Sequence, residues 1–99
     1  MTTDTQIELF LAQPAYAVIG ASRDRSKYGN KVLRCYQQNG RTVYPVNPNA
    51  DEIEGLACSP DLASLPDQVK AASIITPPEV TERIVEQAAE AAIFWGQFI

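Results

Sequence analysis

The sequence contains no histidine and only two cysteines, Cys35 and Cys58. A zinc site needs about four clustered nitrogen or sulfur ligands, so this composition argues against a structural or catalytic zinc. Because nothing in the sequence indicates secretion, we expect reduced thiols, with Cys35 packed into the core from a helix. No nucleophile is paired with a base in any visible pattern, and we therefore expect no catalytic activity from this chain.

The sequence also lacks a long apolar run and a basic N-terminal segment. We therefore expect neither a membrane span nor a signal peptide, and we expect a cytoplasmic location. Positive charge is scarce, since 8 Lys and Arg stand against 12 Asp and Glu. A protein that binds duplex nucleic acid needs an extended basic face, so we expect no nucleic-acid partner. A length of 99 residues, 45% of them hydrophobic, predicts a single domain over residues 1–99.

The scarce positive charge is concentrated in one segment. Residues 20–34 carry five basic side chains and one acid, a local charge of +4, so the rest of a chain of net charge −4 carries −8. This segment follows an apolar run and precedes a helical pattern, and free N–H groups at such a turn bind phosphates in α/β proteins. The pattern indicates an anionic ligand. The basic residues are Arg23, Arg25, Lys27, Lys31 and Arg34.

Strand-like and helix-like patterns alternate along the chain. This alternation predicts an α/β fold with an open parallel sheet and helices on both faces. We expect strands at 16–19, 42–46 and 72–75, with Pro45 in an edge strand or at a strand end. We expect irregular structure or a short extended piece over 51–58, and a single helical turn from Ser59 to Pro66. We expect helices over 4–12, from Ser26 or Asn30 (each a plausible N-cap) to Gly40, and from the capping residue Thr76 onward.

Two common phosphate-binding motifs do not fit the basic loop. The Walker pattern needs Gly-Lys followed by a hydroxyl residue, and residues 29–31 (Gly-Asn-Lys) lack both the hydroxyl and the spacing. The dinucleotide fingerprint G-x-G-x-x-G starts at Gly20, but Ser22 and Arg25 occupy the other two glycine positions. A Walker-type NTPase is therefore disfavoured.

The end of the second strand narrows the choice of ligand. NAD-binding domains place an Asp or Glu there to hold the ribose hydroxyls, whereas this chain has Val46, Asn47 and Pro48. An uncharged residue is compatible with a ribose that carries a phosphate, because a carboxylate would repel the phosphate. Coenzyme A has a 3′-phosphate on its ribose and NADP has a 2′-phosphate, so both fit this test and plain NAD does not.

Five segments in fixed order carry a likeness to a known family. They are Ala17-Val18-Ile19-Gly20-Ala21-Ser22, Lys27-Tyr28-Gly29-Asn30, Val43-Tyr44-Pro45-Val46-Asn47-Pro48, Ile53-Glu54-Gly55 and Thr76-Pro77-Pro78. On these segments the chain resembles the small stand-alone CoA-binding proteins, whose fold also forms the CoA-binding domain of the succinyl-CoA synthetase alpha subunit. The likeness covers residues 4 to about 92. It implies a Rossmann-like, three-layer domain that binds coenzyme A.

The resemblance also implies where the ligand lies. The small residues after the first strand would contact the pyrophosphate, with the Ser22 hydroxyl as a donor, and the start of the next helix would close over it. The Asn-Pro pair would border the adenosine, and the Thr-Pro-Pro segment would line the path of the pantetheine arm. With the basic candidates added, the expected site residues are Gly20, Ala21, Ser22, Arg23, Lys27, Tyr28, Gly29, Asn47, Pro48, Thr76, Pro77 and Pro78.

The end of the chain departs from the family pattern. Relatives continue past the third helix with a strand that ends in a Trp-x-Gln-Pro-Gly-like turn, then another helix and strand. Residues 92–99 take that place here, without charge and without the proline, so we expect a shortened C-terminal part. The closing residues 93–99 are strand-like in composition, and they are also a candidate surface for self-association.

Together these observations favour a module that binds CoA or acyl-CoA and has no catalysis of its own. No histidine is present to carry a phosphoryl group, as the ligase relatives require. The alternative is an NADP-binding reductase fragment. That alternative lacks room for a substrate domain and an evident proton donor.

Overall fold

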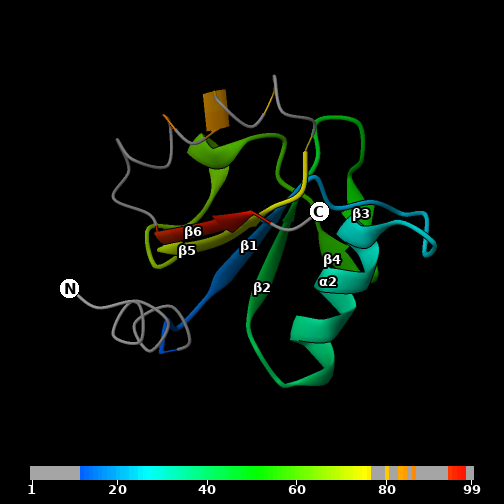
Figure 1. Cartoon of the computed structure of the whole chain (residues 1–99), viewed down its shortest axis with the longest axis horizontal. Helices are drawn as coiled ribbons and strands as arrows, with labels where there is room; N and C mark the ends of the chain where they lie inside the picture. The colour runs from blue at the N-terminus through cyan, green and yellow to red at the C-terminus, as the bar shows by residue number, and fades with distance from the viewer. Residues whose placement is uncertain (1–11, 77–79, 81–82, 85, 87–93, 98–99) are drawn as a thin grey trace.

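The computed structural model describes residues 12–76, 80, 83–84, 86 and 94–97, and a four-stranded parallel sheet dominates it (Figure 1). Every neighbouring pair of strands runs parallel, in the order β2-β1-β5-β6. This confirms the open parallel sheet of an α/β, Rossmann-like fold. The strands are β1 (Tyr16–Ile19), β2 (Val43–Val46), β5 (Ala71–Ile74) and β6 (Phe94–Gln97).

The remaining elements pack on or beside this sheet. They are the helix α2 (Tyr28–Gln38), the antiparallel pair β3 (Glu52–Ile53) and β4 (Leu56–Ala57), and the 3-10 turn η1 (Leu62–Ser64). Residues 80, 83, 84 and 86 also have helical backbone. The helix expected over 4–12, and the rest of the helix expected from Thr76 onward, lie outside the described residues.

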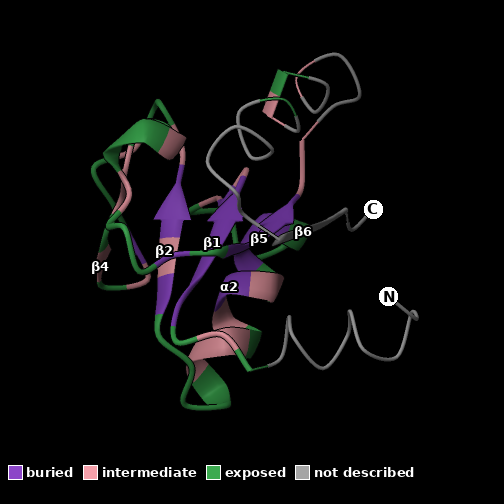
Figure 2. Cartoon of the chain, turned by 90° about the vertical axis from the view of Figure 1, so that its left-hand side faces the viewer, coloured by how far each residue is buried: buried purple, intermediate pink, exposed green. Residues whose placement is uncertain are grey.

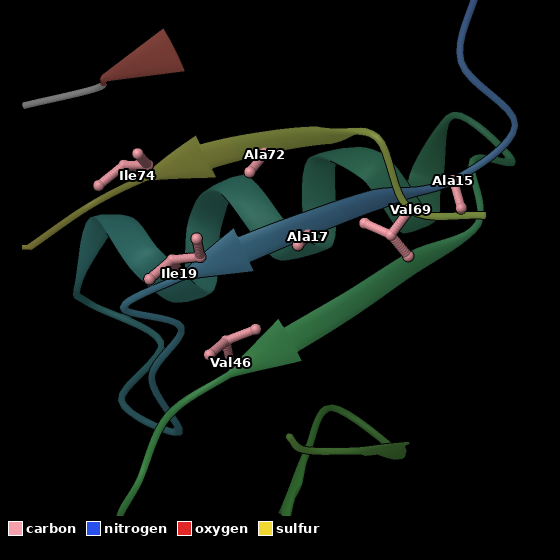
Figure 3. Close-up of a cluster of buried hydrophobic side chains, with 7 residues drawn as sticks. All are labelled: Ala15, Ala17, Ile19, Val46, Val69, Ala72 and Ile74. Atoms are coloured by element: carbon pink, nitrogen blue, oxygen red, sulfur yellow. The ribbon is translucent and has the colours of Figure 1, made fainter. Parts of the chain in front are cut away.

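Strand β1 is the centre of the core, and each of its residues is 4% exposed or less. Tyr16 and Val18 face α2 and the β3–β4 pair, where they pack with Leu33. Ala17 and Ile19 face the opposite side, where partly buried side chains from the η1 region and Ile84 cover them. Figure 3 shows this second cluster with α2 behind the sheet, and Figure 2 shows that the strands β1, β2 and β5 are buried almost throughout. Burial on both faces explains why the strand sequences are apolar without alternation.

Helix α2 begins differently from the expectation but ends as expected. The N-cap is Lys27, which makes no side-chain cap, so the expectation of Ser26 or Asn30 was wrong. Ser26 instead donates its hydroxyl to Asp24 Oδ1 at 2.6 Å. The C-terminal expectation is confirmed, because Gly40 has φ +69° and the bond from Arg41 N–H to the Tyr36 carbonyl (2.9 Å) closes a Schellman motif.

Three further expectations need correction or refinement. Residues 51–58, for which we expected irregular structure or a short extended piece, contain a β-hairpin, and Glu54 and Gly55, both with positive φ, form its two-residue turn. Cys35 is exposed on α2 and does not belong to the core, because it lies on the face of α2 opposite the sheet-facing Leu33. Strand β5 starts and ends one residue earlier than expected. By contrast, Pro45 lies in the edge strand β2, as expected.

The C-terminal residues that the structure describes extend the sheet. Strand β6 pairs with β5 from Ala71↔Phe94 to Ile74↔Gln97, which confirms the strand-like composition over 94–97. Self-association through residues 93–99 stays a prediction. In the part of the chain that the structure describes, no helix has the length and apolar character to cross a membrane.

Two glycines let the end of β1 contact the backbone of α2 and of Ile75, the residue after β5. A Cβ atom on Gly29 would collide with the Gly20 carbonyl oxygen and lie 3.1 Å from Ala21 Cα. A Cβ atom on Gly20, whose φ is +91°, would collide with the Ile75 carbonyl oxygen. All of these obstacles are backbone atoms, which cannot rotate away. The connection from β1 to α2 therefore requires glycine at positions 20 and 29.

We expect Gly29→Ala to destabilise the protein by roughly 1–3 kcal/mol, because the added methyl group must push α2 away from the end of β1. Urea denaturation measures the loss. Gln38→Ala, at the exposed end of the same helix, is the control and should change stability by less than about 0.5 kcal/mol. Equal stability of the two variants would show that α2 can shift freely.

Candidate functional site

A cleft of about 260 Å³ opens at the carboxyl edge of the sheet. The ends of β1 and β2 form one side of it, and the η1 turn and the chain that follows β5 form the other. Its walls are mostly apolar, with a few polar groups among them, which is typical of small-molecule sites. The lining residues are Ile19, Gly20, Val46, Asn47, Pro48, Pro60, Asp61, Leu62, Thr76, Val80 and Ile84.

The cleft brings together expected site residues that are far apart in the sequence. Gly20, Asn47, Pro48 and Thr76 all line it. The parallel strands explain this arrangement, because their carboxyl ends meet at the same edge. Pro77 and Pro78 lie outside the described residues. The other expected residues belong to the loop 20–30, which continues from the rim of the cleft.

The start of this loop offers backbone donors. The Gly20 N–H is not one of them, since it donates to the Val46 carbonyl at 3.0 Å. The next residue, Ala21, is fully buried, and the hydrogen bonds among the described residues give its N–H no acceptor. A buried amide without a partner is costly, and such amides usually meet a ligand or an ordered water.

Polar side chains hold this loop in shape. Ser22 Oγ accepts from the Asp24 N–H at 3.0 Å, so its own hydroxyl proton remains available to a ligand. Asn47 Nδ2 donates to the Ala21 carbonyl at 2.8 Å and ties the end of β2 to the loop. Asn47 Oδ1 in turn accepts from the Asn49 N–H at 2.8 Å. The Asn47 side chain is therefore used for positioning, and its role in the fold does not depend on a ligand.

The basic residues of the loop divide into two groups. Arg25 forms an ion pair with Glu54, with Nη2 at 3.0 Å from Oε1, and Arg34 Nε donates to Asn30 Oδ1 at 2.7 Å. Arg23 uses only Nε, which donates to the Glu52 carbonyl at 2.9 Å. Lys27 and Tyr28 are exposed, Tyr28 to 60%, at the start of α2. In the described part of the chain, Arg25 is the one of the five basic residues that forms an ion pair, and Arg23 and Lys27 are the exposed cations that precede α2 without one.

Residues that the sequence analysis did not assign to the site also belong to it. Asp61 is the one carboxylate among the described residues that line the cleft, and its Oδ1 accepts from the Ser64 N–H at 3.0 Å. The sequence showed Asp61 only as the start of a helical turn. Asn30 and Glu54 lie behind the loop, and no sequence pattern indicated their contact because 24 residues separate them.

Among the described residues, the titratable groups beside the cleft include no activated thiol. Burial raises the pKa of the Cys58 thiol, whose Sγ donates to the Asn47 carbonyl at 3.6 Å. The thiol is therefore protonated near neutral pH and is a weak nucleophile. Two hydrogen-bonded partners, first Arg25 and then Asn30, lower the pKa of Glu54 from 4.5 to about 2. Within the described ranges, no group of three or more His, Cys, Asp or Glu side chains could hold a metal ion.

Comparison with known proteins identifies the class. Residues 14–97 match the family described as CoA binding domain. The chain therefore belongs to this family of CoA-binding domains, and the resemblance found in the sequence is confirmed.

Relatives of this chain include both larger ligases and small proteins. It is 40% identical over 79 residues to the ADP-forming acetate–CoA ligase II of Archaeoglobus fulgidus; the match covers 78% of this chain but only 12% of the ligase. It is 39% identical to the apo form of a dinucleotide-forming acetyl-coenzyme A synthetase 1 from Ca. Korarchaeum cryptofilum, with TM-score 0.78, over 87% of this chain and 19% of that one. A conserved hypothetical protein from Pyrococcus furiosus is 38% identical, with TM-score 0.76, over 83% of this chain and 73% of that one.

The lowered pKa of Glu54 predicts how stability depends on pH. The pKa is lower in the folded state than in the unfolded state, so the paired carboxylate stabilises the fold above about pH 4.5. This contribution disappears as the pH falls towards 2. We expect the difference in urea midpoint between the wild type and Glu54→Gln to be constant from pH 5 to 8 and to shrink below pH 4.5.

The matched control for this experiment is Glu52→Gln, which changes an exposed carboxylate in the same hairpin. Its difference from the wild type should be small at every pH. A Glu54→Gln difference that stays constant down to pH 2.5 would contradict the assignment.

Proposed function

We propose that this chain binds coenzyme A or an acyl-CoA at the carboxyl edge of its sheet and has no catalytic activity of its own. The observation that carries the proposal is the turn after β1, in a chain that belongs to the CoA-binding domain family: Gly20 lines the cleft, and the N–H of the next residue, Ala21, has no acceptor among the described residues. A phosphate oxygen is a suitable acceptor for such an amide.

The electrostatics of the loop support an anionic ligand. Arg23 and Lys27 extend from the loop without an ion pair among the described residues, whereas Arg25 is paired with Glu54. The exposed aromatic ring of Tyr28 follows Lys27 at the start of α2, so cationic and aromatic side chains lie together beside the N-terminus of the helix. These are groups that bind phosphates and cover a nucleotide.

The composition of the cleft suits the other parts of the ligand. Val46, Leu62 and Ile84 provide apolar area for a flexible pantetheine arm or an adenine ring. Asn47, and not a carboxylate, follows β2, and its amide is already bonded to the Ala21 carbonyl. A ribose that carries a phosphate therefore meets no negative charge at the end of β2. Asp61, on the opposite wall, has a carboxylate oxygen left to accept a hydroxyl or amino group.

The absence of catalysis follows from the groups at the cleft. The chain has no histidine, and the Cys58 thiol is protonated near neutral pH because burial raises its pKa. The ADP-forming ligases that resemble this chain are several times longer, so their activity belongs to proteins with further segments. We therefore assign this chain a binding role.

Calorimetric titration with CoA, NADP, NAD and ADP tests the proposal. We expect CoA to bind in the micromolar range or tighter, because several charge-assisted hydrogen bonds of about 1.5–3 kcal/mol each add to the apolar contacts. NADP should bind at least tenfold more weakly. Binding of NADP with no heat from CoA would instead favour the reductase fragment, and binding of NAD would show that the end of β2 does not discriminate.

The basic candidates are tested by Arg23→Gln combined with Lys27→Gln. We expect this variant to bind CoA roughly a hundredfold more weakly or worse, because each of the two lost contacts to a phosphate costs about 1.5–3 kcal/mol. Its melting temperature should change little, since both side chains are exposed. Lys31→Gln with Lys70→Gln removes the same charge elsewhere and should stay within about threefold of the wild type. Equal effects of the two pairs would remove Arg23 and Lys27 from the site.

A further inference from the structure

The loop that carries the proposed phosphate site rests on the β3–β4 hairpin. Three contacts join them: Arg23 Nε to the Glu52 carbonyl (2.9 Å), Arg25 to the Glu54 carboxylate (3.0 and 3.3 Å), and Asn30 Nδ2 to Glu54 Oε2 (3.0 Å). Two of the three end on the single side chain of Glu54. The hairpin therefore acts as a support on which the conformation of the loop depends.

Asn30 is the buried centre of this contact. Its side chain is fully buried and uses each of its polar atoms. Nδ2 donates to the Ser22 carbonyl at 2.8 Å and to Glu54, and Oδ1 accepts from Arg34 Nε at 2.7 Å. One amide thus connects the start of the loop, its end in α2, and the hairpin. A fully bonded buried amide of this kind fixes one geometry, because any other would leave polar atoms unpaired.

Glu54 stands at a position where its residue type is unexpected. The first residue of this two-residue turn has φ +50°, and Asn, Asp or Gly are the residues that such turns favour. The backbone of Glu54 is held by Gln37, whose Nε2 donates to the Glu54 carbonyl at 3.1 Å. Its side chain is 18% exposed and turned to Arg25 and Asn30. Glu54 therefore stands against the local preference of the turn, and in return its side chain makes the contacts to Arg25 and Asn30.

We propose that Glu54, acting through Asn30 and Arg25, is a positioning residue for the phosphate-binding loop: it holds residues 21–29 in the binding geometry without contacting the ligand. This inference rests on the proposed function and adds a requirement to it. The contacts of Glu54 order the loop before the ligand binds, so the entropy lost on ordering it does not reduce the binding free energy. Because Arg25 is paired with Glu54, the phosphate contacts would come from Arg23, Lys27 and the backbone.

The inference can be separated from simple electrostatics because the two predict opposite signs. Removal of a carboxylate near an anion site should strengthen binding of an anion if only long-range charge matters. Removal of Glu54 should weaken binding if the loop loses its support. Glu54→Asn is the sharpest variant, because Asn-Gly is a preferred sequence for this turn and its shorter side chain does not reach Arg25 and Asn30 as Glu does.

The control is Glu52→Asn, which removes the same charge from the same hairpin. The Glu52 side chain is exposed and makes no hydrogen bond or ion pair in the part of the chain that the structure describes, and its carbonyl remains available to Arg23. We expect Glu54→Asn to bind CoA at least tenfold more weakly than the wild type, and Glu52→Asn to stay within twofold of it or bind slightly tighter.

Two further measurements exclude a general loss of structure. The melting temperature of Glu54→Asn should stay within a few degrees of the wild type, and amide hydrogen exchange should accelerate in residues 21–29 but not in β1 or β5. Adenosine, which has no phosphate, should bind the variant and the wild type equally. Should Glu54→Asn bind adenosine and CoA with the same fractional loss, or keep wild-type affinity for CoA, the positioning role is overturned.

The outcome also distinguishes this inference from the proposed function. A wild type that fails to bind CoA overturns both. A wild type that binds CoA, with a Glu54→Asn variant that binds equally well or tighter, overturns the positioning role alone and leaves CoA binding intact.

Discussion

The contact on which the rest of the structure depends is the one between backbone atoms at Gly20, Gly29 and Ile75. No side chain can stand at either glycine, because a Cβ atom would meet a carbonyl oxygen of a neighbouring segment. This contact sets the distance between β1, α2 and β5, and it forces the chain to leave the sheet at Gly20 with φ +91°. The loop, the cleft and the start of α2 take their positions from it. Gly29 thereby performs the close packing of helix on strand that the third glycine performs in the dinucleotide fingerprint, at a longer spacing.

The basic residues of the loop divide into those that hold the loop in place and those that we propose bind the ligand. Arg25 and Arg34 are engaged with Glu54 and Asn30, and these contacts hold the loop against the β3–β4 hairpin. Arg23 and Lys27 form no ion pair with the described acids. The loop is therefore less basic towards a ligand than its composition indicates. The division follows from burial: Glu54, at 18% side-chain exposure, accepts Arg25 at close range, whereas Lys27 points into solvent.

Membership of the CoA-binding domain family agrees with the physical character of the cleft. Apolar walls from three segments meet a turn whose Ala21 N–H has no acceptor among the described residues, and such a combination suits a ligand with both a diphosphate and an apolar arm. The same domain occurs as a small part of long ADP-forming ligases and in a stand-alone protein of comparable size. Membership of the family therefore does not by itself fix what a given chain does, because the same domain is found in proteins of very different length.

The sequence by itself determined the strand positions within one residue, the edge location of Pro45, the Gly40 end of α2 and the family, because these depend on local periodicity, on proline and glycine geometry and on motifs in order. It did not reveal the α2 cap, the hairpin over 52–57 or the exposure of Cys35. The hairpin and the cap arise from local contacts that the residue pattern did not specify: Glu52 and Ile53 pair with Ala57 and Leu56, and Ser26 bonds Asp24 instead of capping α2. The exposure of Cys35 depends on which face of α2 meets the sheet. Three features were decided only by the tertiary structure. Asn30 bonds Glu54 and does not cap the helix, and Asp61 lines the cleft. The Gly20 N–H donates to the Val46 carbonyl at the end of β2. A hydrogen bond between residues distant in the sequence produces no periodic sequence pattern, because it forms only where the folded backbone brings donor and acceptor together.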